Sequence, residues 1–396
     1  MLRATLVACE EGIMDRSESV GTCGGAATVL VAIELSKSAW VLAVHDPITD
    51  KISRRRVDSG DTAGLIAICE KARGAAAGRL LKPVDIECVF EAGYDGFWLQ
   101  RRLQQEGIAC RVMDPASLKV DRRARRVKTD RIDAESLLRA LQAWRRGDRQ
   151  ACNFVRVPTI EEEDARRPHR ELNRLRKERV GHVNRIKALL ALHGISNYQP
   201  MRQDRRSKLA ELRTGEGQTL PPACRAEIDR ELARLELVLD HIAQVKAVLA
   251  ASQTTNASDA DAMLLEKLTC VGHETAIVLS REVLCREFRD RRSLAAFAGL
   301  TPSPYSSGRL QHDQGISKAG NSIVRARLVQ LAWRWVRFQN GSDITTWFIQ
   351  RTAGQSRRSR RVAIVAVARK LLVALWRYAT QGLVPAGARL KPIAAS

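Results

Sequence analysis

The stretch TVLVAIELSKSAWVLAVHD, residues 28–46, decides how the N-terminal part of the chain folds. Both of its halves are rich in β-branched and other apolar residues, and the polar triplet at residues 36–38 separates them. This pattern predicts two strands joined as a β-hairpin. The segment KISRRRVDSG, residues 51–60, follows it and predicts a third strand.

Helix and strand patterns alternate after these three strands. Helices are expected at residues 62–73 and 94–106, the second closed by Gly107. Strands are expected in VDIECVFEAG and in IACRVMDP, and KTDRIDAESLLRALQAWRRG has the apolar spacing of a helix. Three early strands followed by alternating helices and strands predict an α/β domain of the RNase H-like (RuvC-like) type.

The rest of the chain has a mainly helical pattern. Two long, charged, amphipathic segments at residues 161–195 and 223–252 predict a helical hairpin or coiled coil, which Pro168 should interrupt near its start. The predicted organisation is a flexible extension (1–28), a nuclease domain (29–150), a helical hairpin (151–262), a C-terminal domain (263–348) and a basic helical segment (349–396).

The charge balance points to a polyanionic partner. The chain has 66 Lys and Arg residues against 44 Asp and Glu residues, a net charge of +22, and nucleic acid is the commonest large polyanion. Nine cysteines occur without a CxxC pair, which favours buried reduced thiols over a zinc ribbon or a disulfide framework. We expect a cytoplasmic, nucleoid-associated bacterial protein without a membrane span, because Arg369 and Lys370 interrupt the most apolar late stretch.

Four acidic residues occupy informative positions. Glu34 ends the first strand pattern, in VAIELSK, and Glu91 ends a later one, in VFEAG. Asp130 and Asp133 lie three residues apart in KTDRIDA, so they share one face of the predicted helix. A D-x-x-D pair on a helix is usually a solvated face, whereas an acid inside an apolar strand is costly to bury unpaired. The strand acids therefore carry more weight than the helix acids.

Convergent carboxylates would suit phosphodiester chemistry. Cutting DNA benefits from two divalent cations that hold the attacking and the leaving oxygen, and Mg²⁺ prefers hard oxygen ligands. The expected cofactor is therefore Mg²⁺ or Mn²⁺.

The chain resembles the DEDD transposases of the IS-one-ten group, relatives of the Piv-type invertases, in VAIELSK, VFEAGYDGFWLQRRLQQEGI, VMDPASLKVDRRARRVKTDRIDAESL and FAGLTPSPYSSGRLQHDQGISKAGNSIVRARLVQLAW. The resemblance places the metal-binding acids of that family on Glu34, Glu91, Asp130 and Asp133. The first of these is normally aspartate, and Glu34 is one methylene longer. The nucleophilic serine of the family falls on Ser307, with Ser306 as the alternative.

The resemblance also implies partners. These are double-stranded DNA at the element ends and the target, a structured noncoding guide RNA, and further copies of the chain in a dimer or tetramer. LEKLTCVGHETAIVLSREV resembles a helix–hairpin–helix in which Gly272 is kept and Cys270 replaces a second glycine. An ordinary helical turn is the alternative for this stretch. The expected nucleic-acid contacts are Arg122, Arg123, Arg125, Arg126, Lys128, Arg131, Gly272, Lys318, Arg325 and Arg327. A solvated basic loop is the alternative for the first six.

Three tryptophans in the C-terminal part have helical spacing. Trp333, Trp335 and Trp347 recur with Leu331 and Phe348, which predicts core residues rather than base-stacking residues.

Two further functions stay open beside transposition. A Holliday-junction-type endonuclease would need only the four acids, and an inactive transposase copy would bind nucleic acid without cutting it. The substitution at Glu34 is the feature that favours the inactive copy.

Overall fold

The computed structural model describes residues 27–93, 96–118, 130–251, 257–307 and 310–392. The side chains of a few more residues, Asp130, Arg131, Ser306 and Ser307 among them, lie outside that description. The chain divides into two compact units, residues 1–157 and 158–396. Each unit is described by itself. The extension expected at residues 1–28 falls almost wholly outside the described residues.

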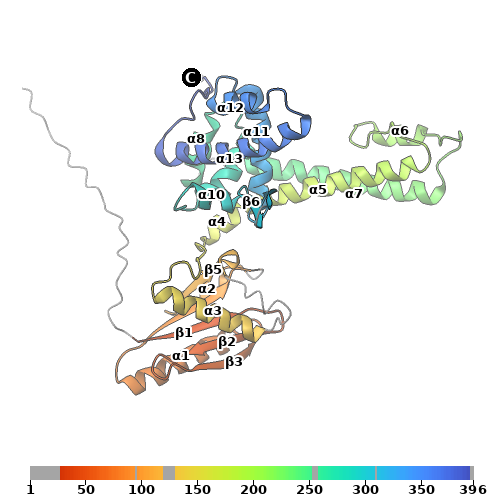
Figure 1. The fold of residues 1–396 in the computed structure, drawn as a ribbon. Helices are drawn as coiled ribbons and strands as arrows, with labels where there is room; N and C mark the ends of the chain where they lie inside the picture. Colours follow the sequence, from red (N-terminus) through yellow and green to blue (C-terminus); the bar gives the residue numbers. More distant parts are fainter. Residues whose placement is uncertain (1–26, 94–95, 119–129, 252–256, 308–309, 393–396) are drawn as a thin grey trace, which may run out of the picture. The chain divides into compact units, whose positions relative to one another are not determined.

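A five-stranded mixed sheet forms the centre of the first unit (Figure 1). The strand order is β3-β2-β1-β4-β5; β1 pairs antiparallel with β2, and β2 pairs antiparallel with β3. β4 runs parallel to β1, and β5 runs parallel to β4. The strands are β1 (Thr28–Glu34), β2 (Ala39–His45), β3 (Ile52–Asp58), β4 (Asp85–Glu91) and β5 (Ala109–Met113). The prediction of a mixed α/β unit is confirmed.

Helices cover both faces of this sheet. On one face, α1 (Thr62–Leu80) and α2 (Trp98–Gln105) pack on Val29, Val31 and Ile33 through apolar residues such as Leu65 and Leu99. On the other face, α3 (Asp130–Arg145) packs on Leu30 and Ala32 of β1. The alternation of side chains along β1 therefore supplies two cores from one strand. A short 3-10 turn, η1 (Pro115–Ser117), follows β5.

The second unit begins with the expected helical hairpin. Its helices are α4 (Ile160–Ala165), α5 (Arg167–Ala191), α6 (Arg205–Glu211) and α7 (Pro222–Ala251). α5 and α7 lie side by side (Figure 1), and Leu190, Leu232 and Leu235 are fully or almost fully buried between them. The helix breaks at Arg166, and Pro168 lies in the first turn of α5, where its missing N–H is not needed. The expected interruption near Pro168 is confirmed.

The remaining elements of the second unit are mainly helical. They are α8 (Ala257–Glu266), α9 (His273–Leu279), the π-helical turn η2 (Ser280–Leu284), α10 (Arg291–Phe297), β6 (Pro302–Ser307), β7 (Leu310–Ile316), α11 (Ser322–Phe338), α12 (Asp343–Thr352) and α13 (Arg357–Gln381). Their shared core includes Trp335, Phe348 and Leu371, together with Leu172 from the base of α5.

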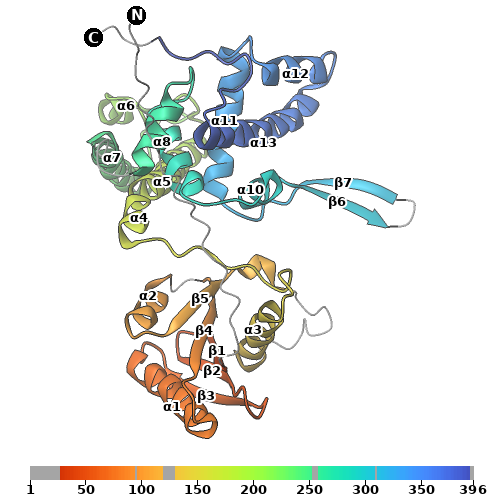
Figure 2. The same ribbon diagram turned by 90° about the vertical axis from the view of Figure 1, so that its left-hand side faces the viewer.

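Several local expectations were wrong or incomplete. The Gly-, Pro- and Ser-rich composition of residues 297–321, FAGLTPSPYSSGRLQHDQGISKAGN, predicts a loop between helices, but within them β6 and β7 pair antiparallel as a two-stranded ribbon (Figure 2). α1 continues seven residues past the predicted end at residue 73, because three alanines at residues 75–77 support a helix. Trp335 is a core residue as predicted, whereas Trp333 is 41% exposed.

The remaining general expectations concern membranes and thiols. Within the described residues, every helix is too short or too polar to cross a bilayer. The seven cysteines in the described part of the chain form no disulfide with one another, and four of them, among them Cys69 and Cys88, lie buried in the first unit.

Candidate functional site

Two of the predicted acids end neighbouring parallel strands. Glu34 is the last residue of β1 and Glu91 the last residue of β4. The preceding residues, Ile33 and Phe90, are register partners, so Glu34 and Glu91 occupy adjacent positions at one edge of the sheet. Leu30 and Ala32 precede Glu34 at two-residue spacing and face α3, and Val89 does the same for Glu91. Both acids therefore belong to the α3 face of the sheet.

The direction of α3 brings its N-terminus to this same edge. At the other end of the helix, Arg145 donates hydrogen bonds to Glu87, near the start of β4, and to Thr28 Oγ1 (3.1 Å), at the start of β1. α3 therefore runs antiparallel to β1 and β4. Asp130 and Asp133, in its first turn, lie toward the carboxyl ends of the strands that carry Glu34 and Glu91.

Asp133 has an unsatisfied carboxylate oxygen. Its Oδ2 atom is buried and has no hydrogen-bond partner among the described residues. A buried carboxylate oxygen without a donor is costly, so this position suits a cation or a donor supplied by a ligand. Within the part of the chain that the structure describes, no three acid, histidine or cysteine side chains lie close enough to form a metal site. The side chain of Asp130 is not part of that description.

A further acid lies at the same edge, and the sequence reasoning missed it. Asp114 follows β5 directly, one residue after the register partner of Glu91. Its N–H donates to Asn153 O (2.8 Å), and its carbonyl accepts a hydrogen bond from Ser117 Oγ (2.7 Å). The signal was available, because VMDP repeats the pattern of an acid at the end of an apolar strand that singled out Glu34 and Glu91.

The basic stretch before α3 lies mostly outside the described residues. This holds for Arg122, Arg123, Arg125, Arg126 and Lys128, and only the backbone of Arg131 is described, in the first turn of α3.

In the second unit, residues 267–272 join α8 and α9, an arrangement that a helix–hairpin–helix and an ordinary helical turn share. Gly272 precedes α9 as its N-cap. Cys270, which replaces the expected second glycine, has a φ of +73°. This left-handed conformation is one that glycine adopts freely and other residues adopt at a cost. The turn is braced by Gln339, whose Nε2 donates to the carbonyls of Thr269 (2.9 Å) and Arg389 (3.0 Å).

The candidate nucleophiles lie at the tip of the ribbon. Ser306 and Ser307 end β6 and pair with Gln311 and Leu310 of β7. We refer to residues 302–316, which form β6, β7 and their connection, as the serine ribbon. Figure 2 shows it extending away from α10.

Two glycines fix the base of the serine ribbon. A Cβ atom on Gly299 would lie 2.1 Å from the carbonyl oxygen of Ala319, and a Cβ on Gly320 would lie 2.3 Å from that of Phe297. Both glycines have positive φ angles, +63° and +102°. The AGL and KAGN motifs therefore allow the two backbone segments that flank the ribbon to pack directly on each other.

A buried carboxylate connects this base to the helical hairpin. Glu282, in the π-helical turn η2, is 1% exposed and accepts hydrogen bonds from His169 Nε2 (2.7 Å), Arg170 Nε (2.7 Å) and Asn321 Nδ2 (2.9 Å). Burial alone would raise the pKa of Glu282, but the hydrogen bonds from His169 and Arg170 outweigh it and hold the pKa at about 2. Asn321 in turn caps α11. We call these four residues the Glu282 node.

The three basic residues expected to contact DNA differ in their surroundings. Lys318 is exposed at the base of the serine ribbon. Arg325 Nη1 donates to the carbonyl of Ala298 (3.2 Å). Arg327 Nη2 is 2.5 Å from Glu274 Oε1, and its side chain is 15% exposed. Arg325 and Arg327 therefore have protein partners in this structure, and of the three only Lys318 is exposed.

Comparison with known proteins adds independent information. A family model described as the transposase IS116/IS110/IS902 family matches residues 262–345, which include the serine ribbon. A relative in Sinorhizobium fredii, carrying the name transposase y4rJ, is 48% identical over 92% of this chain and 94% of its own length. The transposase for insertion sequence element IS1111A of Coxiella burnetii is 28% identical over 64% of this chain and 67% of its own length. The transposase for IS1328 of Yersinia enterocolitica is 25% identical over 90% of this chain and 98% of its own length.

These matches define the class of protein as a transposase, an enzyme that cuts and rejoins DNA. The identity to the Sinorhizobium relative extends over almost the whole length of both chains. The protein therefore belongs to the IS116/IS110/IS902 family of transposases.

Proposed function

We propose that the protein mobilises an insertion sequence by cutting and rejoining DNA with a metal-binding carboxylate cluster and a serine nucleophile. The observation that carries the proposal is the convergence of Glu34, Glu91 and the first turn of α3 on one edge of the sheet, where Asp133 has a buried, unsatisfied oxygen. Three antiparallel strands followed by two parallel strands with helices between them support an RNase H-like (RuvC-like) assignment for this unit.

The chemistry of the donor set fits Mg²⁺, although Glu34, Glu91 and Asp133, the three acids whose side chains the structure describes, would have to lie closer together to hold an ion. Glu34, Glu91, Asp130 and Asp133 would hold it, since carboxylate oxygens are the ligands that this ion prefers. The bound ion would stabilise the attacking and leaving oxygens of a phosphodiester exchange. Ser307, with Ser306 as the alternative, would form an ester bond to the phosphorus while the bond to one DNA oxygen breaks. The serine proton would leave with the released DNA hydroxyl, and reversal of the step would rejoin the strand.

The partners proposed for this activity are double-stranded DNA at the element ends and target, a structured noncoding RNA that guides their choice, and further copies of the chain. The net charge of +22 supports polyanionic partners.

Cleavage of DNA that carries the ends of the element, in the presence of the RNA transcribed from them, tests the carboxylate cluster. Asp133→Asn should abolish Mg²⁺-dependent cleavage, since a neutral amide is a poor ligand for this ion. Glu135→Gln is the matched control, because Glu135 lies on the same helix but accepts a hydrogen bond from Arg54 Nε of β3 (2.5 Å). Equal Mg²⁺-dependent cleavage by Asp133→Asn and Glu135→Gln would contradict a metal-binding role for Asp133. Cleavage by Glu34→Asp alone, with none by the natural chain, would identify an inactive copy.

A covalent protein–DNA adduct on a denaturing gel tests the serine. We expect an adduct that requires Mg²⁺ and disappears in Ser307→Ala. Loss of the adduct in Ser306→Ala instead would identify Ser306 as the nucleophile. Cleavage without any adduct would favour a Holliday-junction-type endonuclease.

A further inference from the structure

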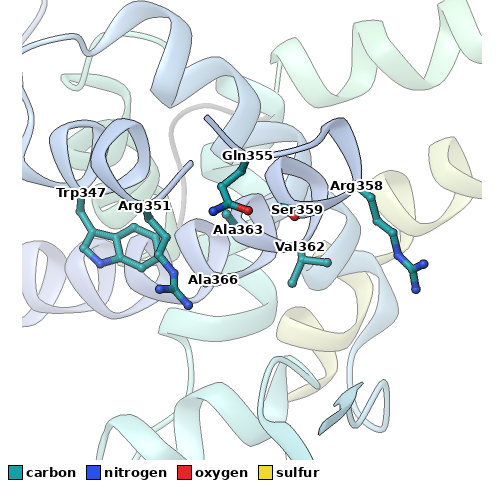
Figure 3. Close-up of a pocket in the computed structure, with 8 residues that line it drawn as sticks. All are labelled: Trp347, Arg351, Gln355, Arg358, Ser359, Val362, Ala363 and Ala366. Carbon is teal, nitrogen blue, oxygen red and sulfur yellow. The ribbon is translucent and has the colours of Figure 1, made fainter. Parts of the chain in front are cut away.

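Two hollows meet at the start of α13, formed by residues that have no part in the proposed carboxylate cluster or the serine ribbon. The first, of about 520 Å³, is lined by Trp347 and Arg351 of α12 and by Arg358 and Val362 of α13 (Figure 3). The second, of about 710 Å³, is lined by Trp333 of α11 and by Arg357, Arg360 and Arg361. Gln355, in the turn between α12 and α13, lines both. We call the two hollows together the α12–α13 groove.

The arginines of this groove lack acidic neighbours. All five are exposed, and none has an ion-pair partner among the residues that the structure describes. By contrast, Arg170, Arg176 and Arg327 elsewhere in this unit are all paired with glutamates. Residues 344–396 contain ten Lys and Arg residues and no Asp or Glu. The positive charge at the groove is therefore available to a polyanion from outside the chain.

Aromatic rings accompany the charge. The ring of Trp333 is packed edge-on against Phe348, with centroids 6.5 Å apart, and the residue is 41% exposed. Trp347 packs on the core, and the ammonium of Lys370 lies 4.6 Å from its ring centroid. Figure 3 shows Trp347 and Arg351 on one side of the hollow and Arg358 on the other, with Val362 and Ala363 between them. Val362 is 67% exposed, so the floor is partly apolar.

We propose that the α12–α13 groove binds single-stranded nucleic acid, with bases stacked on the indoles and phosphates held by the arginines. Exposed aromatic rings bordered by basic side chains are the means by which proteins hold single strands without reading their sequence. A duplex fits less well, because its bases already stack on one another and offer the indoles no free face. The inference rests on the proposed function only in taking nucleic acid as the polyanion, and it requires neither the metal nor the serine.

The test measures binding of the full chain to labelled oligonucleotides of about 12 nucleotides, within the range of single-strand sites. Single-stranded DNA, single-stranded RNA and duplex DNA are compared in EDTA, so that failure of the cleavage chemistry cannot affect the result. Trp333→Ala should weaken single-strand binding about 5- to 100-fold and leave duplex binding unchanged. Trp333→Phe, which keeps a ring, should retain most of the affinity. A preference between the DNA and RNA arms identifies which strand the groove takes.

The arginines are tested by a charge-matched pair of variants. Arg357→Gln/Arg361→Gln should reduce the slope of log K against log salt by about 1.4, as expected for two lost phosphate contacts on a single strand. Arg55→Gln/Arg56→Gln removes the same charge from exposed positions on β3 of the other unit and should leave the slope unchanged. Both variants keep the core intact, so their folding is not at issue.

Three outcomes would overturn the proposal. The first is an equal decrease of the salt slope in both double variants, which would show that the net charge of the chain, and not the groove, causes the decrease. The second is an equal loss of duplex and single-strand binding in Trp333→Ala. The third is a change of oligomeric state in Arg357→Gln/Arg361→Gln with unchanged oligonucleotide binding, which would assign the surface to another copy of the chain. Photocrosslinking of iodouracil-containing oligonucleotides to peptides that carry Trp333 or Trp347 would support it directly.

Discussion

Single residues decide how closely the segments around the serine ribbon pack. At Gly299, a positive φ and a backbone carbonyl 2.1 Å from the Cβ position both exclude a side chain. We expect Gly299→Ala to lower the free energy of unfolding of the second unit by about 3 kcal/mol. Hydrogen exchange of α10 and α11, with urea unfolding followed by circular dichroism, would measure the loss.

Gly382 provides the control for this substitution. Its φ of +70° is close to the +63° of Gly299, but nothing lies within 4 Å of its Cβ position. Gly382→Ala should therefore cost only the conformational strain, about 1 kcal/mol. If the two variants are equally stable, the close approach of Gly299 to Ala319 does not constrain the ribbon base.

The conformation or the burial of some single residues could not be predicted from the sequence. Cys270 was identified as a replacement for glycine only through the family resemblance, and its left-handed backbone follows from the turn around it. Trp333 and Trp335 lie two residues apart on α11, and their spacing with Leu331 did not separate the buried indole from the exposed one. Which face of α11 is covered depends on α12 and α13, so local spacing alone could not decide it.

At the scale of elements, the Glu282 node joins α5, η2 and α11. Because the pKa of Glu282 is depressed from 4.5 to about 2 in the folded chain, its ionised form stabilises the fold fully above about pH 4.5. That stabilisation, about 3 kcal/mol, is lost as the pH falls toward 2. Glu282→Gln should therefore destabilise the second unit by about 2–4 kcal/mol at neutral pH and remove this part of the acid dependence.

Urea unfolding at several pH values would measure the difference between the natural chain and Glu282→Gln. Glu211→Gln, at an exposed ion pair with Lys208 on α6, is the control and should change stability little at any pH. If the free energy of unfolding of Glu282→Gln depends on pH in the same way as that of the natural chain, the ionised carboxylate of Glu282 does not stabilise the fold.

The elements themselves were predictable to different degrees. The strands of the first unit follow from short runs of β-branched and other apolar residues separated by polar breaks, as in residues 28–46, and α5 and α7 follow from long amphipathic spacing. The serine ribbon did not follow, because PSPYSSG combines prolines, serines and a glycine that favour turns. Its strand pairing depends on β7 and on the packing of Gly299 against Ala319. The edge formed by Glu34 and Glu91 was predictable from the two strand ends, whereas the Glu282 node joins residues more than 100 positions apart.

At the scale of the whole molecule, the net charge of +22 sets the behaviour with nucleic acid. If binding neutralises six or more phosphates, raising the salt concentration from about 50 to about 200 mM should weaken DNA binding on the order of 10³-fold. A salt titration of binding to a DNA duplex of unrelated sequence measures this salt dependence of the affinity. A loss smaller than about tenfold would mean that most of the charge lies away from the phosphates.

The Glu282 node also limits which parts of this chain can be exchanged with those of a relative. His169 and Arg170 come from the start of the helical hairpin, whereas Glu282 and Asn321 come from the region that the family model covers. A chimera that takes the hairpin from one relative and the later segment from another would inherit half of a buried charge pair unless both parents share it. Recombination between elements would then favour crossover points before α5, where the two halves of the pair are inherited together.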